Sequence, residues 1–474
     1  MGGAAAAIED RVEALLWPFV QQVLDTWALP GLAVCVVHDR DRVMARGFGT
    51  RDRSTGEPVT PDTPFHLASI SKSFVATAVM QLVEAGELDL GGALTTYLPD
   101  LPWADPRAGD ITLVDVLSHR SGIGDVSDYG WHQPELDDGA LGRFANQVAG
   151  WPLERDPGSA YAYSNAAYEV LGHLLAVVSG RTFEDHLRDR VLRPAGMATS
   201  TFLPAEVPQG LGARPHLGLP SRVLDGAYPY TRQHAPSSSL HAGAAELGTW
   251  MVAHLAGGAG LLSPQAHAAM WRPRGPSGGV WQAETALGWF WGTCRGLPVV
   301  NHSGSDPGFE THLALWPDLG LGVVVLADSN TAPIMQLAEA AVDVLLGRTP
   351  PDPPPPPAAV PLGPVLHRYG VPAAVEAHRK LVADDPRFAD AEHDGLEDAV
   401  WGAVEMHRTD VARPVLDLWR RLRPGSAAMW STSAWAHEVD GRPADAVEHA
   451  RRALGLDPDD GEAAALLRRL SADP

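Results

Sequence analysis

The chain has 474 residues and a net charge of −22, with 58 acidic side chains against 36 lysines and arginines. This length is enough for two or three domains, and the negative charge argues against nucleic acid or an anionic membrane as a partner. The first residues lack the basic region of a signal peptide and no apolar run is long enough to cross a bilayer, which indicates a cytoplasmic protein.

The chain opens with an amphipathic helix that is followed by two strands. Apolar residues recur at helical spacing over residues 8–23, and Pro18 predicts a kink or a break within this helix. Residues 31–38 and 42–50 have the composition of strands. The chain has only two cysteines, one of them Cys35 in the first strand, so we expect small core residues and no disulfide framework.

A serine and a lysine stand three residues apart where the next helix begins. They occur in Ser69-Ile-Ser-Lys72, which precedes an apolar helical pattern that ends near Gly86. Residues three apart share one face of a helix, so a lysine whose pKa is lowered by burial could take the proton of the serine hydroxyl. A helix cap followed by a solvated lysine would give the same letters, but only one other lysine, Lys380, occurs in the chain.

The middle of the chain is mostly helical, and strands return late. Helices are expected at residues 111–119, 168–179, 183–192, 244–255 and 333–346, and irregular surface chain at 204–239. Late strands are expected at residues 288–294, 298–302, 312–316 and 321–328. Strands at both ends predict an α/β (α+β) domain, in which one antiparallel sheet built from both ends carries an inserted helical subdomain. The Ser69 helix would lie at their junction, where small-molecule sites often form.

A proline-rich segment precedes a helical C-terminal region. The predicted units are a first domain at 1–347, a proline-rich linker at 348–361 and helical repeats at 362–474. Three similar segments begin at Ala374, Ala412 and Ala446. Pro424 and Pro458, which follow two of them, lie 34 residues apart, the period of tetratricopeptide repeats. We expect the repeats to bind a protein partner or to self-associate while the first domain folds alone; a permanent buttress is the alternative.

Two further motifs could complete a site around Ser69. Tyr163-Ser-Asn165 offers a phenol that can act as a general base, and an amide that can hold a lysine or a substrate carbonyl. A buried aromatic residue before a turn asparagine would look the same. His302-Ser-Gly304 ends a late strand, where Gly304 would let a substrate approach the backbone closely.

Together, the three motifs resemble a known family. Ser69-Ile-Ser-Lys72, Tyr163-Ser-Asn165 and His302-Ser-Gly304 resemble, in this order, the active-site signatures of serine hydrolases of the class C β-lactamase and penicillin-binding-protein superfamily. They are most similar to its D,D-carboxypeptidases, D-aminopeptidases and esterases. The resemblance covers residues 8–346. It implies a β-lactamase/transpeptidase-like fold and an acyl-enzyme formed from a D-amino-acid peptide, a small acyl ester or a β-lactam-like substrate, without a cofactor.

The resemblance also implies residue roles. Ser69 would be acylated, and Lys72 and Tyr163 would share the base role. The substrate-binding residues would be Asn165, His302, Ser303, Gly304 and Ser305. Backbone N–H groups of Ser69 and Ser305 would form the oxyanion hole. His302 stands where β-lactamases carry a lysine, and a neutral imidazole attracts a carboxylate less well than an ammonium does. This departure disfavours β-lactams and leaves amides and esters open.

Other types of active site, and functions of other classes, have less support in the sequence. The chain has no His-Glu-x-x-His metal helix, and its histidines show no metal-ligand spacing. A function of another class is a non-catalytic ligand sensor or scaffold whose helical repeats bind a protein partner. Turnover of a generic ester separates this alternative from a hydrolase.

Overall fold

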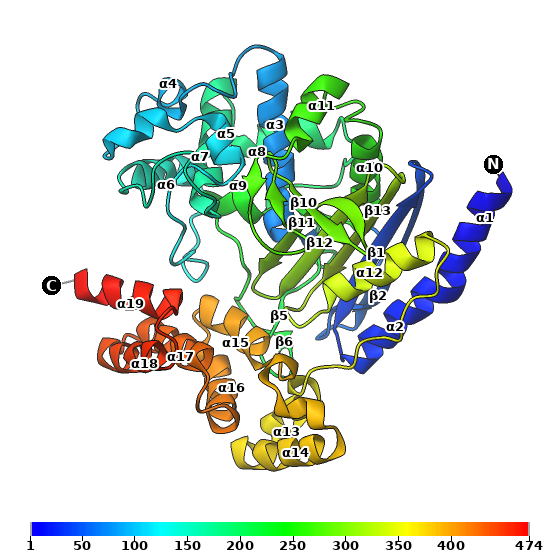
Figure 1. Ribbon diagram of the computed structural model, residues 1–474, viewed down its shortest axis with the longest axis vertical. Helices are drawn as coiled ribbons and strands as arrows, with labels where there is room; N and C mark the ends of the chain where they lie inside the picture. The colour runs from blue at the N-terminus through cyan, green and yellow to red at the C-terminus, as the bar shows by residue number, and fades with distance from the viewer. Residues whose placement is uncertain (1, 473–474) are drawn as a thin grey trace.

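The computed structural model describes residues 2–472 and has two parts, a sheet covered by helices and an array of C-terminal helices (Figure 1). Nine strands form the main sheet in the order β3-β2-β1-β13-β12-β11-β10-β9-β8. At its centre β1 (Gly31–His38) pairs antiparallel with β13 (Leu321–Ala327), which places Leu32 opposite Ala327. The predicted antiparallel sheet built from both ends of the domain is therefore confirmed.

The remaining strands extend the sheet on both sides of this central pair. The longer ones are β2 (Arg42–Asp52), β10 (Phe290–Cys294), β11 (Leu297–Asp306) and β12 (Phe309–Trp316). Two-residue strands complete the edges and form two small separate pairs: β3 (Glu57–Pro58), β8 (Gly275–Pro276), β9 (Glu284–Thr285), β4 (Phe65–His66), β7 (His241–Ala242), β5 (His216–Leu217) and β6 (Arg222–Val223). Both cysteines are free and buried.

One face of the sheet is covered by helices from the two ends of this part. The N-terminal helix consists of α1 (Gly2–Arg11), a π-helical turn at Val12–Leu16 and α2 (Trp17–Thr26). It packs with α12 (Ile334–Leu345) in one apolar cluster on β1 and β13. The helical turns continue through Pro18, which lies in the first turn of α2 directly after the π-helical turn, so the chain does not break there.

The opposite face carries the inserted helical subdomain. Its helices are α3 (Ser71–Glu84), α4 (Leu94–Tyr97), α5 (Leu113–Leu117), α6 (Ala140–Ala149), α7 (Asn165–Ser179), α8 (Phe183–Leu187), α9 (Ala235–Ser238), α10 (Ala244–Leu255) and α11 (Pro264–Trp271). Thr112 caps α5 through a reciprocal capping box with Asp115. The sequence did not single out α6 and α11. No helix in the described part of the chain has the length and hydropathy to cross a membrane.

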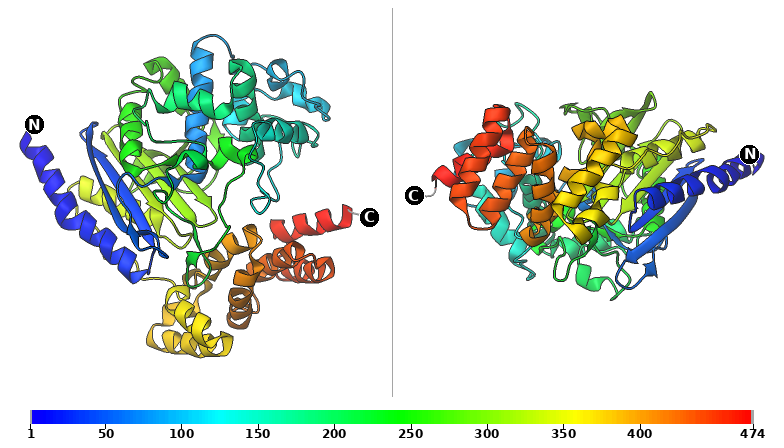
Figure 2. Two further views of the ribbon diagram at one scale, coloured as in Figure 1. Left: turned by 180° about the vertical axis from the view of Figure 1, so that it is seen from behind. Right: turned by 90° about the horizontal axis from the view of Figure 1, so that it is seen from below.

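The C-terminal part is entirely helical. It contains α13 (Ala359–Tyr369), α14 (Val371–Asp384), α15 (Leu396–Glu405), α16 (Thr409–Leu422), α17 (Ala427–Val439), α18 (Pro443–Leu456) and α19 (Gly461–Ala472). The three repeated segments fall on α14, α16 and α18, and an extended residue follows both α14 and α18. In both views of Figure 2 these helices form an array beside the sheet-containing part. Their assignment to the tetratricopeptide class stays a prediction.

The two parts share an apolar core. Trp131, Leu217 and Leu224 of the first part are buried in the same cluster as side chains of the C-terminal helices. A Cβ atom on Gly218 would lie 2.4 Å from a methyl of Val411, so the contact is close. The proline-rich segment is also anchored, because Trp27 Nε1 donates to the backbone oxygen of Pro354 at 2.8 Å. These contacts favour the alternative in which the C-terminal helices pack permanently on the first part and support it.

Candidate active site

Ser69 lies where β11 crosses the beginning of α3. It occupies a 3₁₀ turn, Ala68–Ile70, that leads directly into the helix, and its side chain is partly exposed. Gly304 of β11 lies against this turn, since a Cβ atom there would be 2.8 Å from Ser69 N and 2.3 Å from Leu67 O. Only glycine allows the strand to approach the serine so closely.

Lys72 is fully buried and points at Ser69. Its Nζ donates to Ser69 Oγ at 2.9 Å, to Asn165 Oδ1 at 2.6 Å and to the backbone oxygen of Ser237 at 2.9 Å. Burial lowers the pKa of Lys72 to about 8, although the charge of Glu169 and those of other acidic groups oppose this shift. Near neutral pH a useful fraction of this lysine is therefore uncharged and able to accept a proton.

The ring of Tyr163 also lies close to Lys72. Lys72 Nζ is 5.0 Å from the centre of the Tyr163 ring, and His119 stacks on that ring with 4.1 Å between the centroids. Burial raises the pKa of Tyr163 well above its ordinary value, and a hydrogen bond with Ser69 partly opposes this. The phenol therefore keeps its proton at physiological pH.

Asn165 begins α7 and connects Lys72 to a loop. Its Oδ1 accepts from Lys72, while its Nδ2 donates to Asp125 Oδ2 at 3.1 Å and to the hydroxyl of Tyr129 at 2.5 Å. Its backbone N–H donates to Asp125 Oδ1 at 2.7 Å. In this arrangement the amide orients the lysine, and its role toward a substrate amide stays a prediction.

His302 is buried on β11. Burial, followed by the charge of Lys72, lowers the pKa of His302 to about 3, so the imidazole is neutral. Its Nε2 has no hydrogen-bond partner among residues 2–472. Ser303 Oγ contacts His312 Nδ1 at 2.9 Å, and Ser305 Oγ donates to the carboxylate of Glu310. The side chains of both serines are thus occupied, which leaves the backbone of Ser305 as the candidate oxyanion donor.

Several contributors to this site were not identified from the sequence. The carbonyl of Ser237, the ring of His119 and the side chains of Asp125 and Tyr129 all contact one of the three motifs. His119 was expected to end a helix over residues 111–119, but α5 ends at Leu117, and no pattern indicated that the ring of His119 would meet Tyr163. The loop residues carry no periodicity that could have placed them.

Three side chains that could bind a metal ion lie close together, and all three are far from Ser69 in the sequence. Asp128, His132 and His407 each place one ligand atom within 4.8 Å of the others. The rings of His132 and His407 are stacked with centroids 3.6 Å apart, and His407 Nε2 lies 3.3 Å from Asp128 Oδ2. Because His407 follows α15, this cluster fastens the loop of Asp125 and Tyr129 to the C-terminal helices.

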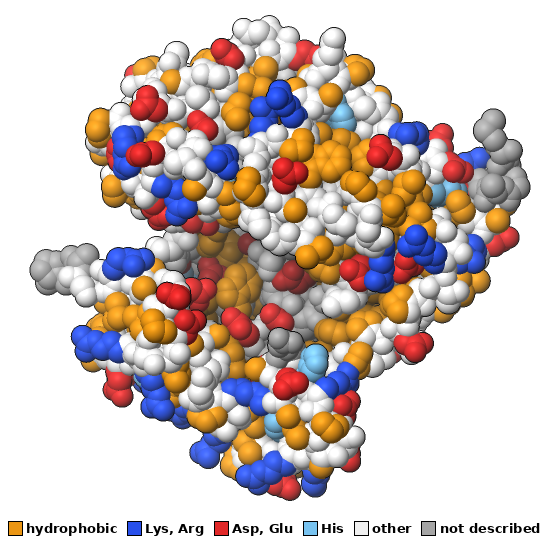
Figure 3. All heavy atoms as spheres, in the orientation of Figure 1, with side chains coloured by type: hydrophobic (Ala, Val, Ile, Leu, Met, Phe, Trp, Pro, Cys, Tyr) orange, Lys and Arg blue, Asp and Glu red, His pale blue; other side chains and the backbone are white. Residues whose placement is uncertain are grey.

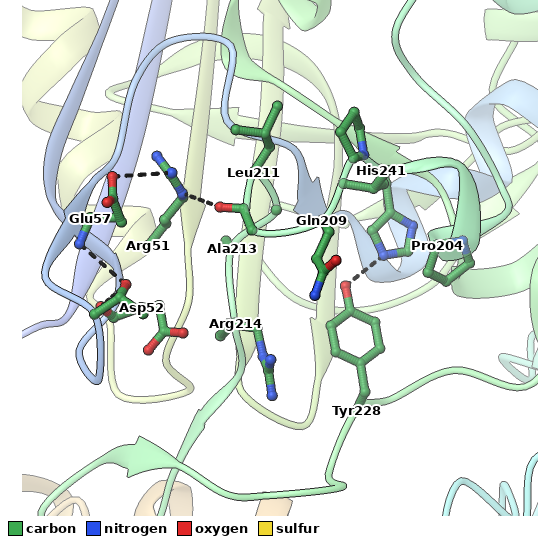
Figure 4. Close-up of a pocket in the computed structure, with 15 residues that line it drawn as sticks. Arg51, Asp52, Glu57, Pro204, Gln209, Leu211, Ala213, Arg214, Tyr228 and His241 are labelled. Atoms are coloured by element: carbon green, nitrogen blue, oxygen red, sulfur yellow. Dashed lines mark hydrogen bonds and ion pairs between the residues drawn. The ribbon is translucent and has the colours of Figure 1, made fainter.

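A separate cavity lies between the end of β2 and the segment that carries Pro204 and Arg214 (Figure 4). It has a volume of about 550 Å³, and its charges are largely compensated, as Arg51 pairs with Glu57. On its wall the hydroxyl of Tyr228 contacts His241 Nε2 at 2.7 Å. The ring of His241 is 5.2 Å from that of His66, which separates this cavity from the serine. The cavity therefore does not contain the candidate catalytic residues.

A family model described as Beta-lactamase matches residues 18–346. The unguisins hydrolase ungD' of Aspergillus campestris is 29% identical over 362 residues, which cover 69% of this chain and 64% of the relative. Penicillin-binding protein 4 of Amycolatopsis lactamdurans is 31% identical over 320 residues, covering 64% of this chain and 82% of the relative. The chain thus spans somewhat less than two thirds of the first relative.

A solved structure supports the fold. The octameric penicillin-binding protein homologue of Pyrococcus abyssi superposes with a TM-score of 0.64 at 24% identity, covering 75% of this chain and 81% of the homologue.

Proposed function

This chain belongs to the beta-lactamase family of serine hydrolases, and we propose on this premise that it cleaves an amide or ester bond through an acyl-enzyme on Ser69. The observation that carries the proposal is the buried Lys72 Nζ, 2.9 Å from Ser69 Oγ and with a pKa of about 8. A solvated lysine beside a helix cap would be exposed and would carry its full charge at neutral pH. The non-catalytic alternative gives no reason to bury this lysine.

In this arrangement every proton that is transferred during the reaction has a donor and an acceptor. Ser69 Oγ attacks the carbonyl carbon of the substrate while its proton passes to neutral Lys72. The oxyanion is held by the backbone N–H groups of Ser69 and Ser305. The bond to the leaving group then breaks, and the leaving group takes the proton of the Tyr163 phenol, which the Lys72 ammonium replaces. Water hydrolyses the acyl ester by the same route, which restores the hydroxyl of Ser69.

The neutral imidazole of His302 narrows the substrate class. A β-lactam presents a carboxylate that a lysine would attract at this position, whereas His302 is held uncharged by burial. We therefore propose amides and esters that do not depend on such a carboxylate, such as D-amino-acid amides or short acyl esters. A cytoplasmic location and a protein partner for the helical repeats remain proposals from the sequence.

Covalent labelling tests the proposed nucleophile. Incubation with a fluorophosphonate should add one adduct to the intact mass, and the Ser69→Ala variant should show none. A p-nitrophenyl ester should be hydrolysed by the unmodified protein and not by the labelled one. An adduct that persists in Ser69→Ala would overturn the assignment, and absence of both labelling and turnover would favour a ligand sensor.

A further inference from the structure

A second cavity lies between the candidate active site and the C-terminal helices. It has a volume of about 270 Å³ and is covered on one side by Val126 and Ser127 of the loop that holds Asn165. On the other side it is lined by one face each of α15, α17 and α19. Figure 3 shows a hollow between the two parts of the molecule, with hydrophobic and acidic side chains on its walls.

The lining is acidic and aromatic. Glu397, Trp401 and Glu405 recur four residues apart along α15, so they share one face of that helix. Trp435 comes from α17 and Glu462 from α19. Trp401 and Trp435 are only partly buried, and both side chains line the cavity.

Glu405 is the residue that indicates a ligand. Its side chain lines the cavity, is only 9% exposed, and has no hydrogen bond or ion pair within the described chain. Arg469 also lines the cavity, but its guanidinium is already paired with Glu438 at 2.7 Å. A buried carboxylate without a partner is costly, which indicates that the missing partner comes from outside the chain.

The electrostatics of the cavity favour a cation. Glu397, Glu405 and Glu462 bring three carboxyl groups to the walls of this one cavity. A positive charge in the cavity would offset the mutual repulsion of these groups. Indole rings add to this because their faces attract ammonium and guanidinium groups.

We propose that this cavity binds a cationic group, an ammonium or a guanidinium, of the substrate that is cleaved at Ser69. The inference rests on the proposed function. Its link to the active site is the loop itself, since Asp125 and Tyr129 contact Asn165 while Val126 and Ser127, between them, line the cavity. A substrate with a basic end would therefore contact both sides of one short loop.

Matched esters test the inference. The kcat/KM of p-nitrophenyl 6-aminohexanoate should exceed that of p-nitrophenyl 6-acetamidohexanoate by at least tenfold in the native protein. The ratio should fall toward one in Glu405→Gln and in Glu462→Gln. Glu448→Gln, which removes an exposed carboxylate on α18, should keep the full ratio. A ratio near one in the native protein, or one that is unchanged in both cavity variants, would overturn the inference.

A binding measurement separates this inference from the proposed function. In the Ser69→Ala protein, hexylammonium should change the tryptophan fluorescence in a saturable manner, and hexanol should not. Hydrolysis of both esters at equal rates would overturn only the cation site. Absence of hydrolysis and of labelling at Ser69 would refute the proposed function, and saturable binding of hexylammonium would then still assign the cavity to a cationic ligand.

Discussion

Replacing Lys72 by methionine should change how stability depends on pH. Burial lowers the pKa of Lys72 from its ordinary 10.5 to about 8. Between these values the unfolded chain retains the proton that the folded protein has released, so raising the pH stabilises the folded state. Well below pH 8 both the folded and the unfolded state are protonated, and the cost of the buried charge is fully present. At 1.36 kcal/mol per pH unit, the free energy of unfolding of the native protein should rise by about 3 kcal/mol relative to that of Lys72→Met between pH 8 and pH 10.5.

The assay is urea unfolding of both proteins at four pH values from 7.5 to 10.5. Methionine cannot make the hydrogen bonds to Asn165 and Ser237, and this loss lowers the free energy of unfolding of Lys72→Met by a similar amount at every pH. Only the slope of the free energy of unfolding against pH therefore measures the release of the proton. Lys380→Met, which removes the exposed lysine of α14, controls for the loss of a lysine elsewhere. If the free energy of unfolding depends on pH in the same way for the native protein and for Lys72→Met, the hypothesis that Lys72 is buried and releases its proton on folding is refuted. In the native protein kcat/KM should rise through the same pH of about 8, because neutral Lys72 is the base.

Four further outcomes are expected. Lys72→Arg keeps the charge but cannot accept a proton, so ester turnover should fall by roughly 10²–10⁴; near-native turnover would exclude the base role. Tyr163→Phe should lose roughly 10²–10⁴ in kcat if the phenol transfers a proton, and an unchanged rate would leave it a packing role. A p-nitrophenyl ester should be preferred over nitrocefin in kcat/KM because His302 is neutral; a strong preference for nitrocefin would contradict this. A chain ending at Arg348 should aggregate or lose activity, since it uncovers Trp131, Leu217 and Leu224, whereas full-length kinetics would show that the first part stands alone.

The sequence predicted the sheet well because its strands are short apolar runs between turn residues. The first strand was expected at residues 31–38 and is found there, fully buried. The last helix of the first part was expected at residues 333–346 and spans Ile334–Leu345. Ser69 and Lys72 could be paired because their contact is local and follows from helical spacing.

Contacts between distant segments were not predictable in the same way. The loop with Asp125 and Tyr129 is ordered by contacts with Asn165 on one side and with the C-terminal helices on the other. Nothing in its local pattern encodes either contact. The same holds for Glu405, which looks like an ordinary end of an amphipathic helix until α17, α19 and the loop enclose it.

The position of β1 in the sheet has a consequence for synthesis on the ribosome. β1 can form its hairpin with β2 early, but Leu32 meets Ala327 only after almost the whole first part has been translated. At ~5–20 residues per second, the 295 residues between them (327 minus 32) take on the order of 15–60 s. For that time the nascent hairpin presents an open, apolar strand edge, the kind of surface that pairs with other chains. We expect this interval to be the one in which the protein depends most on chaperones.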